Sequence, residues 1–517
     1  MPTWFPVRRA GATAVSLAAA ILAVVSVRSQ VLPGGIGALQ HPIRTASADT
    51  QWLFNQGLTL FYGFNREGAR QSFLQASSLD PMAAMPFVGL ALAAGPNLNS
   101  DPTRAEIDAG CAAARKAKTL ARQADERGYA DALIGRYCAG LTADSATGYA
   151  IDTGEIFQQR QDDPDAAALY ADSLVSLRPR SAEQNVELVA VLEQALKRWP
   201  AHVGANHYYI HAVEGSRAPE RALPSAQRLE TLVPAIGHLL HMPAHVYSRT
   251  GDFARAIASN QRATAADLAY ILANGESDEQ RMYHHHDLES LAVAAGFAGR
   301  FAVAERAGAA AAHDRFSPVL GFVLLRFNRS NDALKLPKPA AAALPDPLWY
   351  HVIRAVAHAR LGQLPQASQE RENFRRLIRD LAPGAIYRQN RAASVVDVFS
   401  AMVDARLSAA GGDSAAAIRN WERAVKAQDL LEYHEPPPVY YPVRESLGAA
   451  RYLARQLPQA EAVFRDDLAR NPRNPRSLFG LWQTQVALGR SGEAAATKRL
   501  FDAAWAGSDT TLSLADF

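Results

Sequence analysis

Hydrophobic residues recur along this chain at helical spacing, in short blocks that each follow a turn. In most blocks a glycine-centred turn precedes an aromatic or apolar residue, an alanine stands three positions later, and another small residue follows. Small residues at such positions let paired helices approach closely, as in arrays of helix-turn-helix repeats. The clearest blocks begin at Gly251-Asp252-Phe253, Gly299-Arg300-Phe301, Gly362-Gln363-Leu364 and Gly412-Asp413.

Two segments of the chain repeat each other directly. RALPSAQRL at 221–229 aligns with RAIASNQRA at 255–263, an offset of 255 − 221 = 34 residues. A helical hairpin of this length is the tetratricopeptide repeat. Related runs stand near the two ends of the chain, at 64–81 and 459–489. The sequence therefore predicts an all-α fold, a tetratricopeptide-type helical-hairpin solenoid wound as a right-handed superhelix.

Loop-forming stretches separate groups of repeats. They are GPNLNSDPT at 95–103, LPKPAAAALPDP at 336–347 and EPPPVYYP at 435–442. The predicted organisation is a signal peptide or signal anchor at 1–30, a linker at 31–48, an N-terminal repeat unit at 49–100, helical repeats at 101–200, a central histidine-rich repeat region at 201–335, a linker at 336–347 and C-terminal repeats at 348–517.

The N-terminus differs from the rest of the chain. Arg8 and Arg9 precede an uncharged small and apolar run at 10–27. This order is typical of an export signal, and about eighteen residues is also the lower limit for spanning a bilayer. We therefore expect an exported protein of the periplasm or cell envelope, with residues 10–27 either cleaved off or kept as an inner-membrane anchor. No A-x-A cleavage triplet closely follows the run, so cleavage stays open; a buried apolar helix is the bland alternative.

Composition and charge narrow the function only slightly. The 54 basic and 51 acidic residues nearly cancel, and no long run of one sign occurs, so nucleic acid is not an expected partner. Only two cysteines occur, Cys111 and Cys138, without a C-x-x-C spacing. The sequence leaves open whether they form a disulfide or remain buried thiols.

Histidines carry the most specific chemical signal. ANHYYIHAVE at 205–214 and HLLHMPAHVY at 238–247 each contain two histidines four residues apart. The offset between the pairs is again 34 residues, from 241 − 207 and 245 − 211. Residues four apart share one helix face, so each pair directs two imidazoles the same way. Nine of the 14 histidines lie within residues 202–286, which favours metal binding over isolated surface histidines.

A third unit repeats part of this pattern, with His286 and Glu289 at the positions that His238 and His241 take before their own turn. We expect rows across the repeats that join His207 with His241 and Glu289, His211 with His245, and His238 with His286. The candidate metal ligands are His207, His211, His241, His245, Glu214, His238, His286 and Glu289.

Nitrogen and carboxylate donors without thiolate fit zinc, copper, iron or manganese. Glu214 or Glu289 is the candidate general base if the site is catalytic. The alternative is a polar, hydrogen-bonded groove that binds a peptide or an anion. His202, His284 and His285 have no partner in the rows, and the lone histidines 351, 358 and 434 are unassigned. The sequence contains no H-E-x-x-H, G-x-S-x-G, P-loop or dinucleotide motif.

The blocks NHYYIHAVE, GHLLHMPAHVY and YHHHDLESL, together with GPNLN, LYADSLVSLRP and EPPPVYYPVRESLGAA, resemble a group of bacterial tetratricopeptide repeat proteins that are mostly exported. The resemblance covers nearly the whole chain after residue 50 and implies that the histidine pairs and Glu214 line the concave groove. Two departures stand out: that group often has histidine in place of Arg66, and H-N-x-H in place of His286-Asp287-Leu288-Glu289. A ligand held through those positions is expected to bind differently here.

Two functions from different classes follow. One is an exported solenoid with a histidine and glutamate metal site in its central groove, acting as a metal-dependent oxidative or hydrolytic enzyme. The other is a non-catalytic scaffold whose groove binds a partner protein or peptide. Metal storage or delivery is a third, weaker alternative.

Overall fold

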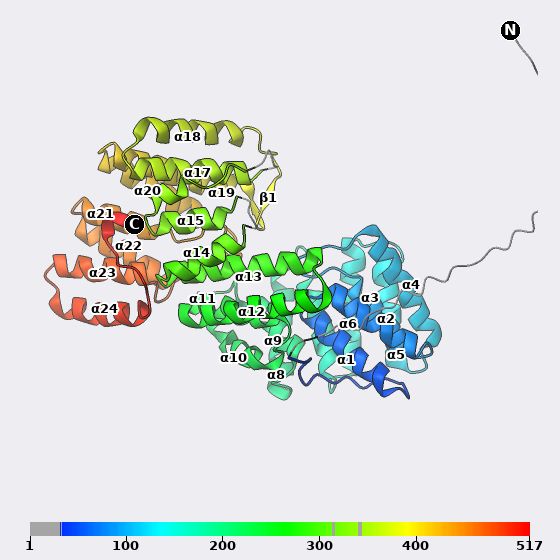
Figure 1. Cartoon of the computed structure of the whole chain (residues 1–517). Helices are drawn as coiled ribbons and strands as arrows, with labels where there is room; N and C mark the ends of the chain where they lie inside the picture. The colour runs from blue at the N-terminus through cyan, green and yellow to red at the C-terminus, as the bar shows by residue number, and fades with distance from the viewer. Residues whose placement is uncertain (1–31, 33, 313–315, 340–343) are drawn as a thin grey trace, which may run out of the picture.

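The computed structural model describes residues 32, 34–312, 316–339 and 344–517. Within them the chain forms 24 α-helices and one two-stranded hairpin (Figure 1), so the predicted all-α helical-hairpin fold is confirmed. The helices are α1 (Ala48–Tyr62), α2 (Arg66–Leu79), α3 (Met85–Ala93), α4 (Arg104–Leu120), α5 (Ala124–Tyr137), α6 (Ala143–Gln159), α7 (Pro164–Val175), α8 (Ala182–Arg198), α9 (Val203–Val213), α10 (Leu223–Leu232), α11 (Gly237–Thr250), α12 (Phe253–Asn274), α13 (Asp278–Phe297), α14 (Phe301–Ala310), α15 (Pro318–Arg326), α16 (Ser330–Ala333), α17 (Asp346–Arg360), α18 (Leu364–Ile378), α19 (Ala392–Ala410), α20 (Ser414–Gln428), α21 (Arg444–Leu453), α22 (Leu457–Arg470), α23 (Pro475–Ala487) and α24 (Ser491–Ala504). The hairpin pairs β1 (Ile386–Tyr387) with β2 (Asn390–Arg391) in antiparallel fashion.

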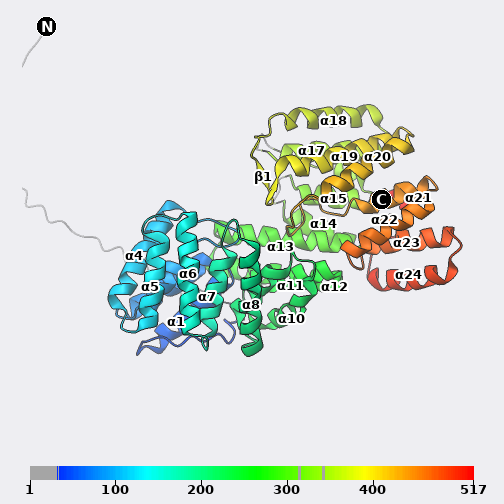
Figure 2. The ribbon, with the colours of Figure 1, turned by 180° about the vertical axis from the view of Figure 1, so that it is seen from behind.

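The helices form two layers along the chain. Nearly every helix packs against the next one, and odd-numbered helices also pack against each other in series, for example α7 with α9, α9 with α11 and α11 with α13. Figure 2 shows α4 to α7 side by side at the N-terminal end, and α17 to α24 at the opposite end, with α10 to α13 between them. This is the layering of a helical solenoid, in which each hairpin buries its apolar face against its neighbours.

Glycine and phenylalanine produce the same close helix packing at both ends of the solenoid. Phe73 of α2 is fully buried and lies against Gly57 and Gly89 of the flanking helices, each 16 residues away (73 − 57 and 89 − 73). A β-carbon on either glycine would lie closer than 3.0 Å to the ring. The same arrangement recurs near the C-terminus, where Phe464 lies against Gly448 and Gly480. The two related runs at 64–81 and 459–489 therefore pack in the same way.

Contacts between distant repeats close the N-terminal half of the chain onto its centre. Helix α1 packs against α9. At the start of α13, Glu279 accepts a hydrogen bond from Arg66 Nε at 3.2 Å, and the Tyr283 hydroxyl lies 3.4 Å from the Asn97 amide nitrogen. Residues that follow α1 and α3 thus reach the centre of the chain.

The C-terminal half closes in a similar way. The Asp509 carboxylate accepts hydrogen bonds from the backbone N–H groups of Phe301 and Ala302, at 2.6 and 2.9 Å, and so caps the start of α14. A buried ion pair joins Arg326 of α15 to Glu445 of α21 at 3.0 Å. A hydrogen bond from the Ser290 hydroxyl of α13 to Glu435, at 3.2 Å, holds the loop between α20 and α21 against α13.

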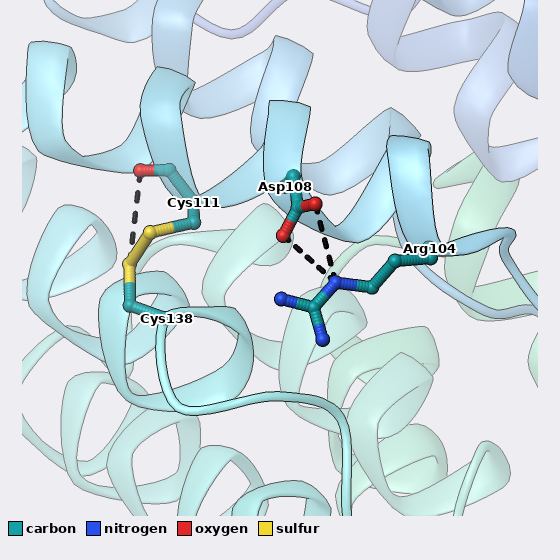
Figure 3. The surroundings of a disulfide bond; sticks show 4 residues. All are labelled: Arg104, Asp108, Cys111 and Cys138. Carbon is teal, nitrogen blue, oxygen red and sulfur yellow. Dashed lines mark hydrogen bonds and ion pairs between the residues drawn. A yellow bond between two sulfur atoms is a disulfide. The ribbon is translucent and has the colours of Figure 1, made fainter.

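Cys111 and Cys138 form a disulfide that ties α4 to the residue after α5 (Figure 3). Their α-carbons are 5.0 Å apart, a distance that suits a disulfide. Of the two alternatives that the sequence left open, the structure shows the bridge. The nearby Arg104–Asp108 ion pair, at 3.0 Å on the exposed side of α4, contributes little to stability.

The predicted signal or anchor at 1–30, including the run at 10–27, lies outside the described residues, as do residues 340–343 of the predicted linker. Among the helices that the structure describes, none combines the length and the apolar character needed to cross a bilayer.

The glycine packing predicts opposite effects for two alanine substitutions. Gly57→Ala forces a β-carbon to within 2.6 Å of the Phe73 ring, so we expect a loss of about 1–3 kcal/mol in unfolding free energy. Gly148→Ala, in the middle of α6 with open space at the β-carbon, is the matched control and should stabilise the protein by about 0.5–1 kcal/mol. Urea denaturation of both variants measures the difference; an equal effect of the two changes would contradict this packing.

Candidate metal centre

Helices α9, α11 and α13 carry the central histidines on adjacent faces. His202 stands apart from them as the N-cap of α9: its Nδ1 accepts the backbone N–H of Ala205 at 3.1 Å, and its Nε2 lies 3.1 Å from Asp165 Oδ1. A side chain that accepts from the first turn satisfies an otherwise orphaned donor. His202 therefore has a structural role.

Four side chains converge between α11, α13 and the loop that follows α20. We call His241, His245, His286 and Glu435 the four-donor cluster; their ligand atoms lie within 4.8 Å of one another. The His241 Nε2 atom is 2.8 Å from His245 Nε2 and 3.1 Å from His286 Nε2. Glu435 Oε2 lies 3.3–3.4 Å from all three nitrogens. A tetrahedral ion with bonds of about 2.0–2.1 Å would separate its ligand atoms by about 3.3 Å, close to these distances.

Hydrogen bonds on the far side of two rings fix which nitrogen faces the centre of the cluster. His241 Nδ1 lies 2.6 Å from the Asn260 side-chain oxygen, and His245 Nδ1 contacts a carboxylate oxygen of Glu214. Because both partners are acceptors, each Nδ1 carries the proton, and the Nε2 atom of the neutral ring presents a lone pair. This is the usual arrangement of a histidine that ligates a metal.

A second group lies beside the first. We call His207, His211 and His238 the three-histidine cluster; their ligand atoms also lie within 4.8 Å of one another. His207 Nδ1 donates to the Tyr62 carbonyl at 2.6 Å, so its Nε2 faces His238 Nε2 as an acceptor at 3.1 Å. Among the described residues, His211 Nε2 and His238 Nδ1 are buried without a hydrogen-bond partner. Both nitrogens are therefore available for hydrogen bonding or ligation.

Glu214 connects the two clusters. One of its oxygens accepts from His211 Nδ1 at 2.9 Å, and the other accepts from His245 Nδ1. Burial alone would raise the pKa of this carboxyl, but His245 and His211 lower it well below its ordinary value. Glu214 is therefore an ionised carboxylate that is occupied on both sides by histidine N–H groups.

Residues after α1 close the three-histidine cluster from the N-terminal side. The Phe64 ring lies 4.5 Å from the His207 ring centre and stacks at 5.8 and 5.1 Å on His211 and His238. Phe64 is only 2% exposed and adopts a left-handed backbone conformation, with φ of 57°. A non-glycine residue in that conformation is uncommon, and here it directs the ring between the histidines.

A cavity of about 1070 Å³ opens onto both clusters. Its wall includes His211 and His238 from one cluster, and His245, His286 and Glu435 from the other. The remainder of the wall is mixed, with apolar, cationic and hydroxyl groups that include Val186, Val189, Met282, Arg180 and Tyr433. This cavity has the size of an organic ligand site.

Burial keeps most of the cluster histidines neutral. It lowers the pKa of His207 and of His238 well below the ordinary value, and neighbouring histidines lower both further. Burial likewise lowers the pKa of His286 to about 4. Neutral imidazoles are the form that binds metal ions.

His241 behaves differently in the metal-free chain. Burial alone would lower its pKa, but the charges of Asp287 and Glu435 outweigh burial and raise the pKa to about 10. Burial would raise the pKa of Glu435, yet His245, His241 and His286 hold it well below its ordinary value. Without an ion, the positive charge of His241 therefore faces the Glu435 carboxylate.

The structure brings together seven of the eight residues that the sequence nominated: the six histidines and Glu214. The eighth, Glu289, belongs to none of the groups of described residues that could hold a metal ion, and it pairs with Arg388 at 2.7 Å. Arg66, one of the two departures from the family pattern, pairs with Glu279 and not with a histidine.

Of the expected rows, His211 with His245 is found, with ring centres 5.7 Å apart, but the other pairings differ. His207 meets His238, and His241 meets His286, both at 3.1 Å. Each contact is shifted by about one helical turn from the expected rows, because a side chain on one helix faces the preceding turn of its neighbour rather than the equivalent position. Glu435 was not predicted. It lies in a loop rich in proline, where no helical period marks a carboxylate as a ligand.

Histidines outside the two clusters have local partners. His351 Nδ1 lies 2.6 Å from Glu370, His358 Nδ1 2.6 Å from Gln363, and His434 Nδ1 3.0 Å from the Pro436 carbonyl. His284 Nδ1 lies 3.5 Å from Asp267.

A further buried group joins His41, Asp163 and Asp165. Asp165 accepts from the Tyr62 hydroxyl at 2.7 Å and contacts His41 at 2.8 Å and His202 at 3.1 Å. Both of its oxygens are thus occupied by protein donors. It fastens the segment before α1 to α7.

No protein-family model matches the sequence, and no curated protein matches it. Among solved structures, the chain is similar to yeast Tom70, with a TM-score of 0.32 and 12% identity over 90% of this chain and 93% of that one. It is also similar to a human IFIT1 dimer solved with m7Gppp-AAAA, with a TM-score of 0.34 and 12% identity over 90% of this chain and 92% of that one. Both likenesses are too distant to carry an argument about this chain.

The position of Phe64 predicts that it shields the three-histidine cluster. Phe64→Ala should lower the unfolding free energy by about 3 kcal/mol or more, because it removes a buried ring and leaves a cavity. It should also make His207 and His211 reactive toward diethyl pyrocarbonate, measured by peptide mass spectrometry, with His351 as the internal reference. Phe64→Leu keeps the apolar fill and should leave the modification pattern unchanged; equal reactivity in wild type and Phe64→Ala would contradict the shielding role.

Proposed function

We propose that this chain is an exported metal-dependent enzyme whose ion is held by His241, His245, His286 and Glu435. The observation that carries the proposal is the convergence of three imidazole nitrogens and one carboxylate oxygen, at near-tetrahedral separations, on the wall of a large cavity. The fold supplies a helical repeat scaffold, and the four-donor cluster supplies the chemistry.

The donors fit a transition metal. Imidazole and carboxylate ligands without thiolate suit zinc, copper, iron and manganese. When bound, such an ion activates water for hydrolysis or, if redox-active, reacts with dioxygen. The identity of the ion therefore decides between the hydrolytic and the oxidative class.

Access to the cluster favours catalysis over a purely structural ion. An ion held by all four donors has a filled tetrahedral shell, so water or substrate from the cavity binds only as a fifth ligand or in place of one donor. The His286 side chain is 27% exposed, and both His286 and Glu435 line the cavity. The buried Tyr433 hydroxyl also lines it and has no partner among the described residues, so it is free to hydrogen-bond to a substrate.

In this proposal neither Glu214 nor Glu289 is the general base. Glu214 accepts hydrogen bonds from two histidines, and Arg388 neutralises Glu289. We assign Glu214 the role of a positioning residue that orients His211 and His245.

Export is part of the proposal and rests on two features. The basic and apolar N-terminal segment is typical of an export signal, and the Cys111–Cys138 disulfide suits an oxidising compartment.

Metal analysis tests the ion site directly. The full-length chain, purified without a histidine tag, should retain a near-stoichiometric transition metal by elemental mass spectrometry. His286→Ala and Glu435→Ala should each weaken retention by about tenfold or more, because each removes one ligand. His351→Ala removes a histidine that pairs with Glu370 elsewhere and should retain the full metal content. A metal-free chain that does not take up zinc, copper, iron or manganese would instead favour the scaffold that binds a partner peptide or protein.

Removal of the ion should cost both stability and activity. A chelator-treated chain should regain about 2.7 kcal/mol of unfolding free energy when the free ion reaches 100 times its dissociation constant. Turnover should return with the same ion: ester or phosphate hydrolysis for zinc, phenol oxidation for copper. Glu435→Gln should lose the turnover, whereas Glu372→Gln, an exposed change on α18 that does not line the cavity, should keep it. A tightly bound ion that restores stability without any turnover would favour metal storage or a structural ion.

A further inference from the structure

We propose that His207, His211 and His238 bind a second transition-metal ion, and that Glu214 couples this ion to the first. This inference rests on the proposed function for the first ion and extends it to a two-ion centre. The three-histidine cluster supplies only neutral nitrogen donors, so it suits zinc or copper.

The ring protons of the three-histidine cluster cannot give every ring nitrogen a hydrogen bond. His207 and His211 each place the Nδ1 proton on an outer acceptor, the Tyr62 carbonyl and Glu214 respectively. The Nε2 atoms of His207 and His211 therefore both present a lone pair, and a neutral His238 ring has only one N–H group to donate to them. His211 Nε2 is buried without a partner in the described part of the chain. A metal ion would accept one lone pair from each of the three rings at once, whereas the single His238 proton can serve only one of the other two rings.

The two clusters adjoin each other with no intervening layer of protein. The His211 and His245 ring centres are 5.7 Å apart, and those of His238 and His241 are 6.0 Å apart. Separations within a cluster are similar, from 4.7 Å for His241 and His245 to 6.5 Å for His245 and His286. Ions in both clusters would therefore be close neighbours.

Glu214 gives the two clusters a shared support. Its two oxygens hold the Nδ1 protons of His211 in one cluster and His245 in the other. An ion bound to His211 or His245 would increase the positive charge on the Nδ1–H group of that ring. The Glu214 carboxylate would then be held more firmly, and so would the other ring that it orients. Binding at one cluster should thus change the affinity of the other.

Both clusters present ligands to the same cavity. His211 and His238 line it beside His245 and His286, whereas Phe64 covers the opposite side of the three-histidine cluster. A ligand in the cavity can therefore reach both ions from one side. The chemical class that this arrangement favours is a small ligand with two donor oxygens, one for each ion.

Copper binding to the metal-free full-length chain provides the test. Cu(II) is added in steps, bound copper is counted by elemental analysis, and electron paramagnetic resonance records each step. The wild type should bind two ions per chain, and at full loading the signal should broaden or lose intensity because the ions lie close together. His211→Gln and His286→Gln should each bind one ion and give a full-intensity mononuclear signal. His351→Gln is the control and should match the wild type.

Glu214→Gln tests the coupling separately. It should still bind two ions, but with affinities reduced by about 10–100-fold, as for other residues that orient a ligating histidine. Loss of stepwise cooperativity in this variant, with the same final stoichiometry, is the result that a merely structural role would not give. Circular dichroism and thermal melting confirm that each variant is folded.

The outcomes separate the two proposals. One bound ion that is lost in His286→Gln and kept in His211→Gln would overturn the second site and leave the proposed function intact. Two ions without mutual broadening would overturn the coupled centre. No bound ion would overturn both proposals, and two coupled ions without turnover would support this inference while removing the enzymatic function. If His211→Gln does not fold, the stoichiometry and spectrum of the wild type decide alone.

Discussion

At the centre of this protein, buried imidazoles face one another with too few protons to give every ring nitrogen a hydrogen bond. Nitrogen atoms of different histidines face each other at 2.8 and 3.1 Å, and only one proton can lie in each contact. A buried polar group without a partner costs about 1–3 kcal/mol, and His211 Nε2 and His238 Nδ1 are two such groups in the described part of the chain. The surrounding helices must hold the rings against that cost, and the Nδ1 partners Asn260, Glu214 and the Tyr62 carbonyl show how they do so.

The solenoid makes this arrangement feasible because its repeats place similar faces side by side. A histidine pair four residues apart on α9 meets a matching pair on α11, and α13 adds His286. Yet a simple array would leave the groove open. Here the distant contacts of the fold close it: Phe64 after α1 covers one cluster, and Glu435 after α20 completes the other. The site therefore depends on segments that are almost four hundred residues apart in sequence (435 − 64).

This division explains what the sequence could and could not predict. The repeat period predicted the helical hairpins, and the spacing of His207, His211, His241 and His245 predicted two imidazoles per helix face, since both follow from local helical geometry. The one-turn shift that joins His207 to His238 depends on how neighbouring helices are staggered, which no local pattern encodes. Glu289 occupies a position equivalent to His241, but Arg388, distant in sequence, neutralises it. Glu435 and Phe64 lie in loops, where the period is lost.

Because ligands come from both halves of the chain, ion binding and closure of the superhelix are linked. An ion that binds only when α9, α11, α13 and the loop after α20 are together stabilises that closed arrangement by mass action. Conversely, contacts that hold the loop after α20 would contribute to affinity, such as the hydrogen bonds from Ser290 to Glu435 and from Arg388 to the Pro436 carbonyl. A repeat protein is otherwise free to open between neighbouring repeats. In the proposed function, an ion at this centre would thus join the two halves of the chain into one cooperative unit.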